Sequence, residues 1–168
     1  KKGLAIRNGG VYSHLVFQSN GKFASNIIPY GKADLILGVD ILEAVRAIDP
    51  SIHQRIGSSK TSVILNTEKT PTILTLLGRD DFDPADLEEM IRKYTNPEGY
   101  FSANLSHASE RYFGTKLYAN VMMLGCAFQA GQLPLSLESL QWAIETTSGA
   151  FYAKNWQAFN IGRKMVLA

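Results

Sequence analysis

The stretch Ala33-Asp34-Leu35-Ile36-Leu37-Gly38-Val39-Asp40 decides how this chain folds. Between its two aspartates the residues are apolar without alternation, interrupted only by Gly38. A short run of this kind is typical of a strand that is buried on both faces in a parallel sheet. Residues 41–48 follow with apolar side chains at helical spacing, and Asp40 stands where a carboxylate caps a helix. We therefore predict a central strand, a sharp turn and a helix.

The carboxyl end of this strand is the first candidate site, because open α/β sheets bind ligands at that edge. Gly38 and Asp40 lie there. A second buried strand is predicted over residues 61–67, with Asn66 and Thr67 at its end. Because a helix joins the two strands, they should run parallel and bring all four residues to the same edge. In the commoner alternative, Gly38 only serves close packing and Asp40 only caps the helix.

The remaining sequence completes a Rossmann-like three-layer α/β/α sandwich with a mostly parallel sheet and a helical C-terminal third. Further extended segments are predicted at residues 11–17, 23–29, 71–78 and 100–105. Helices are predicted at residues 52–56, from Asp83-Pro84 onward, at 108–113 behind Ser106, at 117–130, after Ser136, and at 152–166. The helix at 117–130 is apolar nearly all round, so we expect Gly125 to allow its close packing against the sheet.

The composition is that of an ordinary globular domain, since 45% of the 168 residues are apolar and 19% are charged. The net charge of +2 is too small, and the basic residues are too scattered, to indicate nucleic-acid binding. No apolar run reaches the length that spans a bilayer, so we expect no membrane association. Cys126 is the single cysteine, which excludes an intrachain disulfide and suits a reducing, cytoplasmic location.

A glycine-containing turn at residues 7–10 is a second candidate site. Its backbone N–H groups and the Arg7 guanidinium could hold an anion, and Gly9 would allow a close approach. Ser13 and His14 follow on a predicted strand, where they point to opposite faces. We place Ser13 on the core side, and His14 on the side of a ligand or partner.

Beyond these sites the residues point to no particular reaction. The three histidines lack the spacing of metal ligands, so no metal site is predicted. Neither a phosphate-binding GxxxxGK[ST] loop nor a serine nucleophile elbow occurs. Residue chemistry alone thus predicts an α/β domain with a ligand edge formed by Arg7, Asp40 and Asn66.

Five motifs in a fixed order carry a family resemblance. They are Gly3-Leu4-Ala5-x-Arg7-x-Gly9 with Ser13-His14, residues 33–44, Val63-Ile64-Leu65-Asn66-Thr67, Asn120 to Gly125 with Leu133-Pro134-Leu135 and Ala143-Ile144, and Asn155-x-x-Ala158-Phe159-x-x-Gly162-Arg163. Together they resemble the gamma domain of 2-oxoacid:ferredoxin oxidoreductases. The closing motif is most similar to that of the indolepyruvate-type members.

The resemblance implies part of an enzyme complex that oxidatively decarboxylates a 2-oxo acid and forms an acyl-CoA, with CoA as co-substrate. Thiamine diphosphate, Mg²⁺ and iron–sulfur clusters would be held by partner subunits or domains, and ferredoxin would accept the electrons. The gamma domain would cover the active-site region, while this chain alone would be inactive and would form a homo- or hetero-oligomer. No catalytic residue is assigned. Candidate residues for substrate or CoA binding, or for the interface, are Arg7, Gly9, Ser13, His14, Gly38, Asp40, Asn66 and Thr67.

The sequence departs from the family pattern at its start. Ile6, Asn8 and Gly10 replace a Gln, a Gly and a Ser, and the family's opening G-x-G-G-x-G strand-turn-helix is not found. We therefore expect residues 1–168 to form a single gamma-type domain without that first unit, leaving a sheet edge exposed. The alternative function is a stand-alone Rossmann-like module that binds a nucleotide or an anion without redox chemistry.

Overall fold

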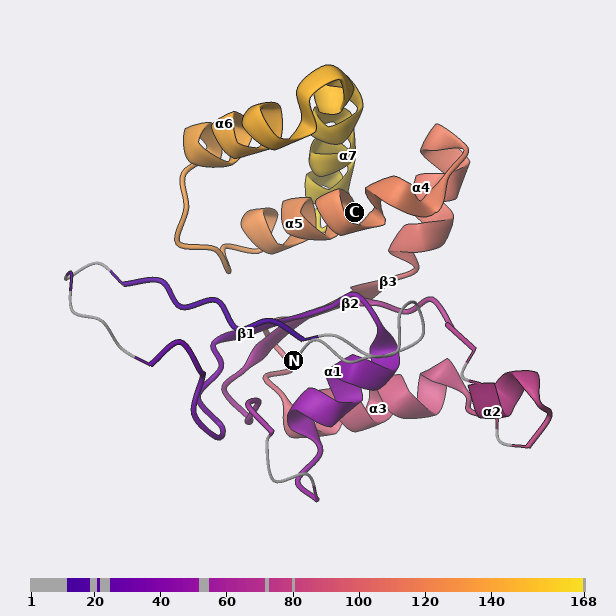
Figure 1. The fold of residues 1–168 in the computed structure, drawn as a ribbon. Helices are drawn as coiled ribbons and strands as arrows, with labels where there is room; N and C mark the ends of the chain where they lie inside the picture. Colours follow the sequence, from indigo (N-terminus) through magenta and orange to yellow (C-terminus); the bar gives the residue numbers. More distant parts are fainter. Residues whose placement is uncertain are drawn as a thin grey trace.

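The fold is a parallel sheet with helices on both faces (Figure 1). The computed structural model describes residues 12–18, 21, 25–51, 55–71, 73–79 and 81–167. In this part of the chain the sheet has three strands, β1 (Leu35–Gly38), β2 (Ser62–Asn66) and β3 (Tyr100–Ala103). Their order is β1-β2-β3, and both pairs of neighbours run parallel. These features confirm the predicted α/β class with a parallel sheet.

The central strand of the described sheet is β2, so within the described residues the prediction that residues 35–38 form a central strand was wrong. Every residue of β2 is buried, because strands pair on both sides of it and helices cover both faces. β1 pairs only with β2 in the described part of the chain, and Leu37 remains 37% exposed. A continuous apolar run indicates that both faces of a strand are suited to burial. It does not indicate whether one or two other strands pair with it.

Two helices cover one face of the sheet, namely α1 (Ile41–Ile48) and α3 (Pro84–Tyr94) (Figure 1). Ile48 and Ile91 are fully buried and share one apolar cluster with Val63 and Leu65 of β2. The sequence predicted both helices. Asp83 caps α3 by accepting a hydrogen bond from the N–H of Ala85 at 2.9 Å, next to the proline that opens the helix.

The other face is covered by the helical C-terminal third (Figure 1). Its helix α5 (Ala119–Gln129) lies nearest the sheet, and α7 (Tyr152–Met165) packs across α5. Ile64 of β2 shares a second apolar cluster with Met122 and Cys126 of α5 and Ala158 of α7. This confirms the predicted helical third. Its helices are α4 (Leu105–Phe113), α5 (Ala119–Gln129), α6 (Leu137–Ser148) and α7 (Tyr152–Met165), with short 3-10 turns at Lys116–Tyr118 and Gly149–Phe151.

Gly125 allows a close approach, but its partner is α7 and not the sheet. A β-carbon on Gly125 would overlap the carbonyl oxygen of Phe159, and one on Gly162 would overlap that of Met122. The two glycines therefore let the backbones of α5 and α7 come into contact. The expectation that Gly125 packs against the sheet was wrong, because the crossing helix fills that side of α5.

The predicted N-terminal strands were wrong within the described residues. Residues 12–18 belong to no strand or helix, and residues 25–29 form bends and loop. Leu15 is 71% exposed and Phe17 is 53% exposed, so their face of the segment is not on the core. Ser13 is exposed as well and does not face the core as expected. An alternating pattern becomes a strand only when a neighbour takes up its backbone hydrogen bonds.

Two smaller differences concern local turn chemistry. Residues 71–78 were expected to be extended, but they contain the short helix α2 (Ile73–Leu76), which ends as the N–H of Gly78 bonds to the carbonyl of Thr75. α4 begins one turn earlier than expected, because Asn104 caps it and accepts from the N–H of His107 at 2.8 Å. Most of the helix predicted at 52–56 lies outside the described residues.

Candidate functional site

The carboxyl ends of β1 and β2 lie at one edge of the sheet, as predicted. Asp40 follows β1 and begins α1. Its Oδ1 accepts hydrogen bonds from the N–H of Leu42 at 2.9 Å and of Glu43 at 3.2 Å. It thereby satisfies two of the N–H groups that a helix leaves free at its start. In this structure Asp40 is a helix cap.

Gly38 lets α1 lie close against the sheet. A β-carbon at this position would be 2.7 Å from Cδ1 of Leu65 and 2.9 Å from Cβ of Ala44. Both separations are well below the optimal distance between carbon atoms of about 3.5–4.0 Å. Glycine at this position therefore serves close packing, as the simpler alternative proposed.

Asn66 joins three elements at the end of β2. Its Oδ1 accepts hydrogen bonds from the N–H groups of Leu105 at 2.9 Å and Ser106 at 3.3 Å, which belong to α4. Its Nδ2 donates to the hydroxyl of Ser106 at 2.9 Å and to the carbonyl oxygen of Val39, after β1, at 3.3 Å. The side chain is buried, so these bonds replace contacts with water. Thr67 follows, and its N–H donates to the carbonyl of Ala103 at 3.0 Å.

Ser106, Glu68 and Lys116 extend this polar network, and no sequence pattern marked them as part of a site. Glu68 pairs with Lys116 from the 3-10 turn before α5, at 2.5 Å between Nζ and Oε1. Burial raises the pKa of Glu68, but hydrogen bonds from Lys116 and Ser106 outweigh it and hold that pKa below its usual value. The same pairing raises the pKa of Lys116. Residues forty to fifty positions apart meet here, which only the tertiary fold brings about.

The donors at this edge are taken up by the protein's own side chains. The first three N–H groups of α4 bond to Asn66 and Asn104. At the start of α1, the N–H groups of Leu42 and Glu43 bond to Asp40. Nucleotide-binding α/β domains leave such N–H groups free for phosphate oxygens. Within the described residues, the edge is thus a packed joint between strands and helices.

The N-terminal candidates lie apart from this network in the contacts that the structure describes. Arg7 and Gly9 lie outside the described residues. His14 is half-buried, and its Nδ1 accepts a hydrogen bond from the N–H of Ile28 at 2.8 Å. His14 thereby ties its segment to the loop before β1.

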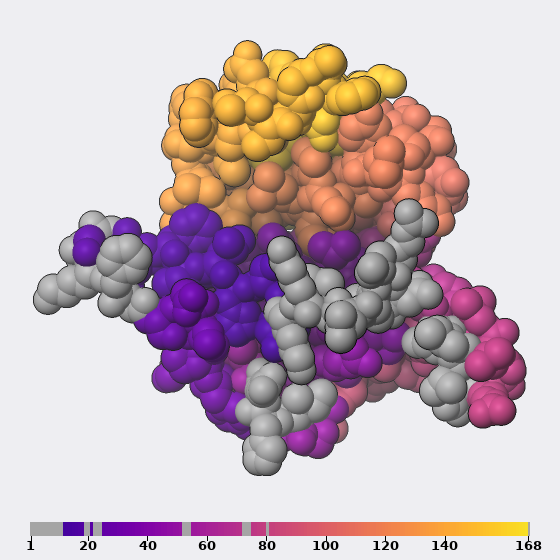
Figure 2. Space-filling view, in the orientation of Figure 1, coloured from indigo at the N-terminus to yellow at the C-terminus, as the bar shows by residue number. Residues whose placement is uncertain are grey.

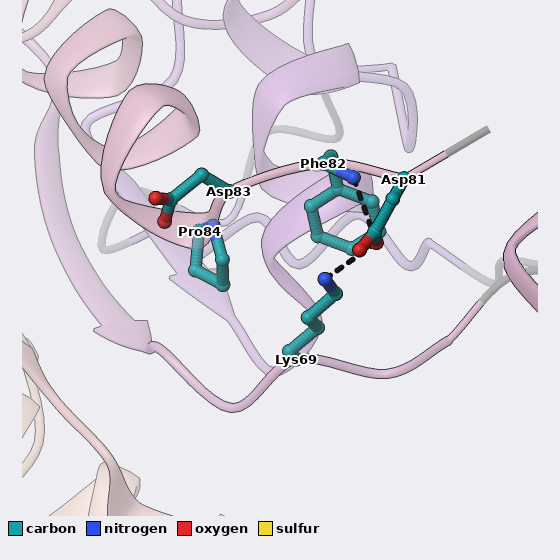
Figure 3. A pocket seen from close by; sticks show the side chains of 5 residues that line it. All are labelled: Lys69, Asp81, Phe82, Asp83 and Pro84. Atoms are coloured by element: carbon teal, nitrogen blue, oxygen red, sulfur yellow. Dashed lines mark hydrogen bonds and ion pairs between the residues drawn. The ribbon is translucent and has the colours of Figure 1, made fainter.

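A shallow depression of about 430 Å³ lies beside the start of α3 (Figure 3). Its charged groups are paired, since Nζ of Lys69 lies 2.5 Å from Oδ1 of Asp81 and 5.0 Å from the centre of the Phe82 ring. Asp83 is occupied as the cap of α3. The depression is open to solvent, and the charged side chains among its described lining residues all have a partner.

A polar cluster fastens α3 to β3. Glu88 accepts from Arg92 at 3.0 Å and from the hydroxyl of Ser102, and the Arg92 guanidinium lies 4.0 Å above the Tyr100 ring. Burial, together with the charge of Glu88, raises the pKa of Tyr100 to about 12. The phenol therefore stays protonated at neutral pH and cannot act as a base there.

Metal and thiol chemistry find no support in the described residues. No three His, Cys, Asp or Glu side chains among them are grouped to hold a metal ion. Cys126 is buried, and burial raises the pKa of its thiol to about 12, so it is neither a ready nucleophile nor a ligand. None of the helices in this part of the chain combines the length and the apolar character needed to cross a membrane.

These features define a Rossmann-like α/β domain with a parallel sheet and a helical C-terminal third. Residues 1–165 match the family described as pyruvate ferredoxin/flavodoxin oxidoreductase. The match covers nearly the whole chain, so this chain belongs to that family. The resemblance noted in the sequence is thereby confirmed.

Two relatives are both described as indolepyruvate oxidoreductase subunit IorB. The one from Methanothermobacter thermautotrophicus is 30% identical over 140 residues, which cover 82% of this chain and 65% of the relative. The one from Archaeoglobus fulgidus is 28% identical over 170 residues, covering 99% of this chain and 78% of the relative. The chain thus spans about two thirds of the length of the first. The comparison with solved structures finds no match.

Proposed function

We propose that this chain is the gamma-type part of an indolepyruvate-type 2-oxoacid:ferredoxin oxidoreductase. The observation that carries the proposal is the family match over residues 1–165, together with the two relatives described as indolepyruvate oxidoreductase subunits. The complex would oxidatively decarboxylate a 2-oxo acid to an acyl-CoA and pass the electrons to ferredoxin. A cytoplasmic location, with its reducing thiol chemistry, suits the unpaired Cys126.

The reacting groups would be held by other subunits or domains of the complex. Iron–sulfur clusters are bound by several cysteine thiolates, and this sequence contains one cysteine, which is buried. The described residues likewise offer no group of carboxylates that could hold Mg²⁺ with thiamine diphosphate. This chain would instead cover the active-site region of its partner and help to exclude water from it.

Substrate or CoA contacts of this chain are proposed for the N-terminal turn. Arg7 is a fixed positive charge that can bind a carboxylate or phosphate in a bidentate manner, and Gly9 would let the backbone approach the same anion. Ser13 and His14 would line the adjoining interface. Gly38, Asp40, Asn66 and Thr67 would support it by holding the strand ends together, as their packing and hydrogen bonds suggest.

Kinetics of the assembled complex test this assignment. Arg7→Ala should raise the Michaelis constant for CoA or the 2-oxo acid severalfold and leave the melting temperature unchanged. In the alternative, Arg7 makes a surface ion pair worth about 0–1 kcal/mol. Lys60→Ala, at an exposed lysine of the turn before β2, serves as a control for the loss of one charge. Unchanged constants for both substrates would reject the role of Arg7.

The second candidate function is a stand-alone module that binds a nucleotide or an anion. The filled strand ends speak against it, because the N–H groups that would hold a phosphate bond to Asp40, Asn66 and Asn104. Co-purification distinguishes the two functions. We expect the chain to be retained stoichiometrically by the thiamine-diphosphate-binding subunit of its own organism. Failure to associate, combined with tight calorimetric binding of ATP or NAD⁺, would favour the stand-alone module.

A further inference from the structure

Strand β3 lies at one side of the described sheet, and half of its backbone groups point away from β2. The carbonyl oxygens of Gly99 and Ala103 accept hydrogen bonds from residues in and after β2, at 2.9 and 3.0 Å, so the odd-numbered residues bond to the sheet. Because successive residues of a strand direct their N–H and C=O groups to opposite sides, those of Tyr100 and Ser102 point outward. In the described part of the chain these four groups have no hydrogen-bond partner.

An antiparallel strand of the same sequence would satisfy all four outward groups. Residues that face each other in an antiparallel pair alternately exchange two hydrogen bonds or none. If a twofold axis passes beside Phe101, Tyr100 of one copy faces Ser102 of the other, and each of these two pairs exchanges two bonds. Phe101 then faces its own counterpart between them. The strand contains no Lys or Pro, the residues with which natural edges discourage pairing.

The side chains of α3 beside this strand carry complementary charges. Glu88 accepts a hydrogen bond from the hydroxyl of Ser102, and the guanidinium of Arg92 lies 4.0 Å from the centre of the Tyr100 ring. The antiparallel arrangement brings Ser102 of one copy beside Tyr100 of the other. It therefore also brings Glu88 of one copy beside Arg92 of the other, whose side chain is 54% exposed. This charge complementarity favours a second copy over an unrelated strand as the partner.

We propose that β3 pairs antiparallel with β3 of a second copy of this chain, so that the described strands of both copies form one continuous sheet. The interface is isologous, so each copy contributes the same outward backbone groups and the same pair of charges on α3. The proposal does not depend on the enzymatic function, because it rests only on the side of the sheet at β3 and on α3.

Charge reversal on α3 tests this pairing by sedimentation velocity. We expect the wild-type chain to sediment as a species of twice the 18.5 kDa chain mass. Arg92→Glu and Glu88→Arg should each be monomeric at concentrations where the wild type is a dimer, because like charges then face each other across the axis. An equimolar mixture of the two variants should recover a dimer, since each glutamate again faces an arginine.

The matched control is Arg46→Glu, which breaks the exposed ion pair with Glu43 on α1 and should leave the dimer intact. A wild-type chain that stays monomeric at every concentration contradicts the proposal. A mixture of Arg92→Glu and Glu88→Arg that remains monomeric contradicts it as well, as does a control variant that dissociates as readily as Arg92→Glu.

Amide hydrogen exchange on the wild-type chain gives an independent readout that requires no variant. In the dimer, the N–H groups of Tyr100 and Ser102 should exchange several-fold more slowly than in the dilute monomer. Those of Phe101 and Ala103 should change less, because they already bond to β2. Fast exchange of the Tyr100 and Ser102 amides in a dimer would place the interface elsewhere and overturn the proposal.

Discussion

At the scale of the residue, Asn66 shows how one side chain can close the end of a strand. It accepts from two backbone N–H groups of α4 and donates to the carbonyl of Val39, so it needs both an acceptor and a donor. An amide supplies both in one plane, whereas a carboxylate would only accept. The asparagine in the motif Val63-Ile64-Leu65-Asn66-Thr67 is therefore explained by its hydrogen bonds between the end of β2, α4 and the residue after β1.

Asn66→Ala should lower the free energy of unfolding by about 2–4 kcal/mol, because several buried backbone groups lose their partners. Denaturant unfolding measures the loss. Asn104→Ala is the matched control, since Asn104 is exposed and accepts only one capping bond, from the N–H of His107. We expect that variant to lose about 1 kcal/mol. Equal losses for the two asparagines would contradict the role of Asn66 as a joint.

The pairing of Glu68 predicts a dependence of stability on pH. Because its folded-state pKa is held below the ordinary value of 4.5, the ionised form stabilises the folded state. That contribution is complete above the unfolded-state pKa and disappears as the pH falls through the folded-state pKa. Melting temperatures between pH 7 and about pH 3 should therefore fall less in Glu68→Gln than in the wild type. Glu145→Gln, at an exposed position of α6, should retain the wild-type slope.

At the scale of the element, the crossing of α5 and α7 holds the C-terminal third together. Gly125 and Gly162 face the partner helix's backbone, so any side chain there must push the helices apart. Gly125→Leu should cost about 1–3 kcal/mol or more by overpacking. Ala153→Leu, at an exposed position of α7, adds volume without contact and should change stability by less than about 0.5 kcal/mol. An unchanged melting temperature for Gly125→Leu would refute the close crossing.

The sequence predicted correctly those helices that carry their own start residues. α3 carries its own start signal in Asp83 and Pro84, and α1 carries its own in Asp40. The position of β1 at the side of the sheet was missed, because the number of neighbouring strands depends on distant segments. The segment at 12–18 has a strand pattern, yet no described strand pairs with it.

In the candidate site, too, some roles could be predicted from local sequence and others could not. From the sequence, a helix cap was already an alternative role for Asp40, and close packing was an alternative role for Gly38. Both roles follow from the position of these residues at the end of a strand. The links from Asn66 to α4 and from Glu68 to Lys116 span some forty residues of sequence. No local pattern marks such contacts, so only the fold could identify Glu68, Ser106 and Lys116.

At the scale of the whole molecule, a small parallel sheet lies between a pair of helices and a larger helical layer (Figure 1). Its strand ends are filled, and its single thiol is buried. Among the large exposed apolar side chains, six lie on residues 12–17 and 27–30, the indigo and purple part of Figure 2, and the others are spread over the rest of the chain. This arrangement fits our proposal that the chain acts through association, with the reacting groups on a partner subunit.

The most direct test is a titration of the purified thiamine-diphosphate-binding partner with this chain, following indolepyruvate-dependent reduction of ferredoxin. We predict no turnover by this chain alone. The rate should rise with added chain and saturate at a fixed molar ratio. Turnover by the isolated chain, or a partner whose rate is unaffected at every ratio, would contradict the account.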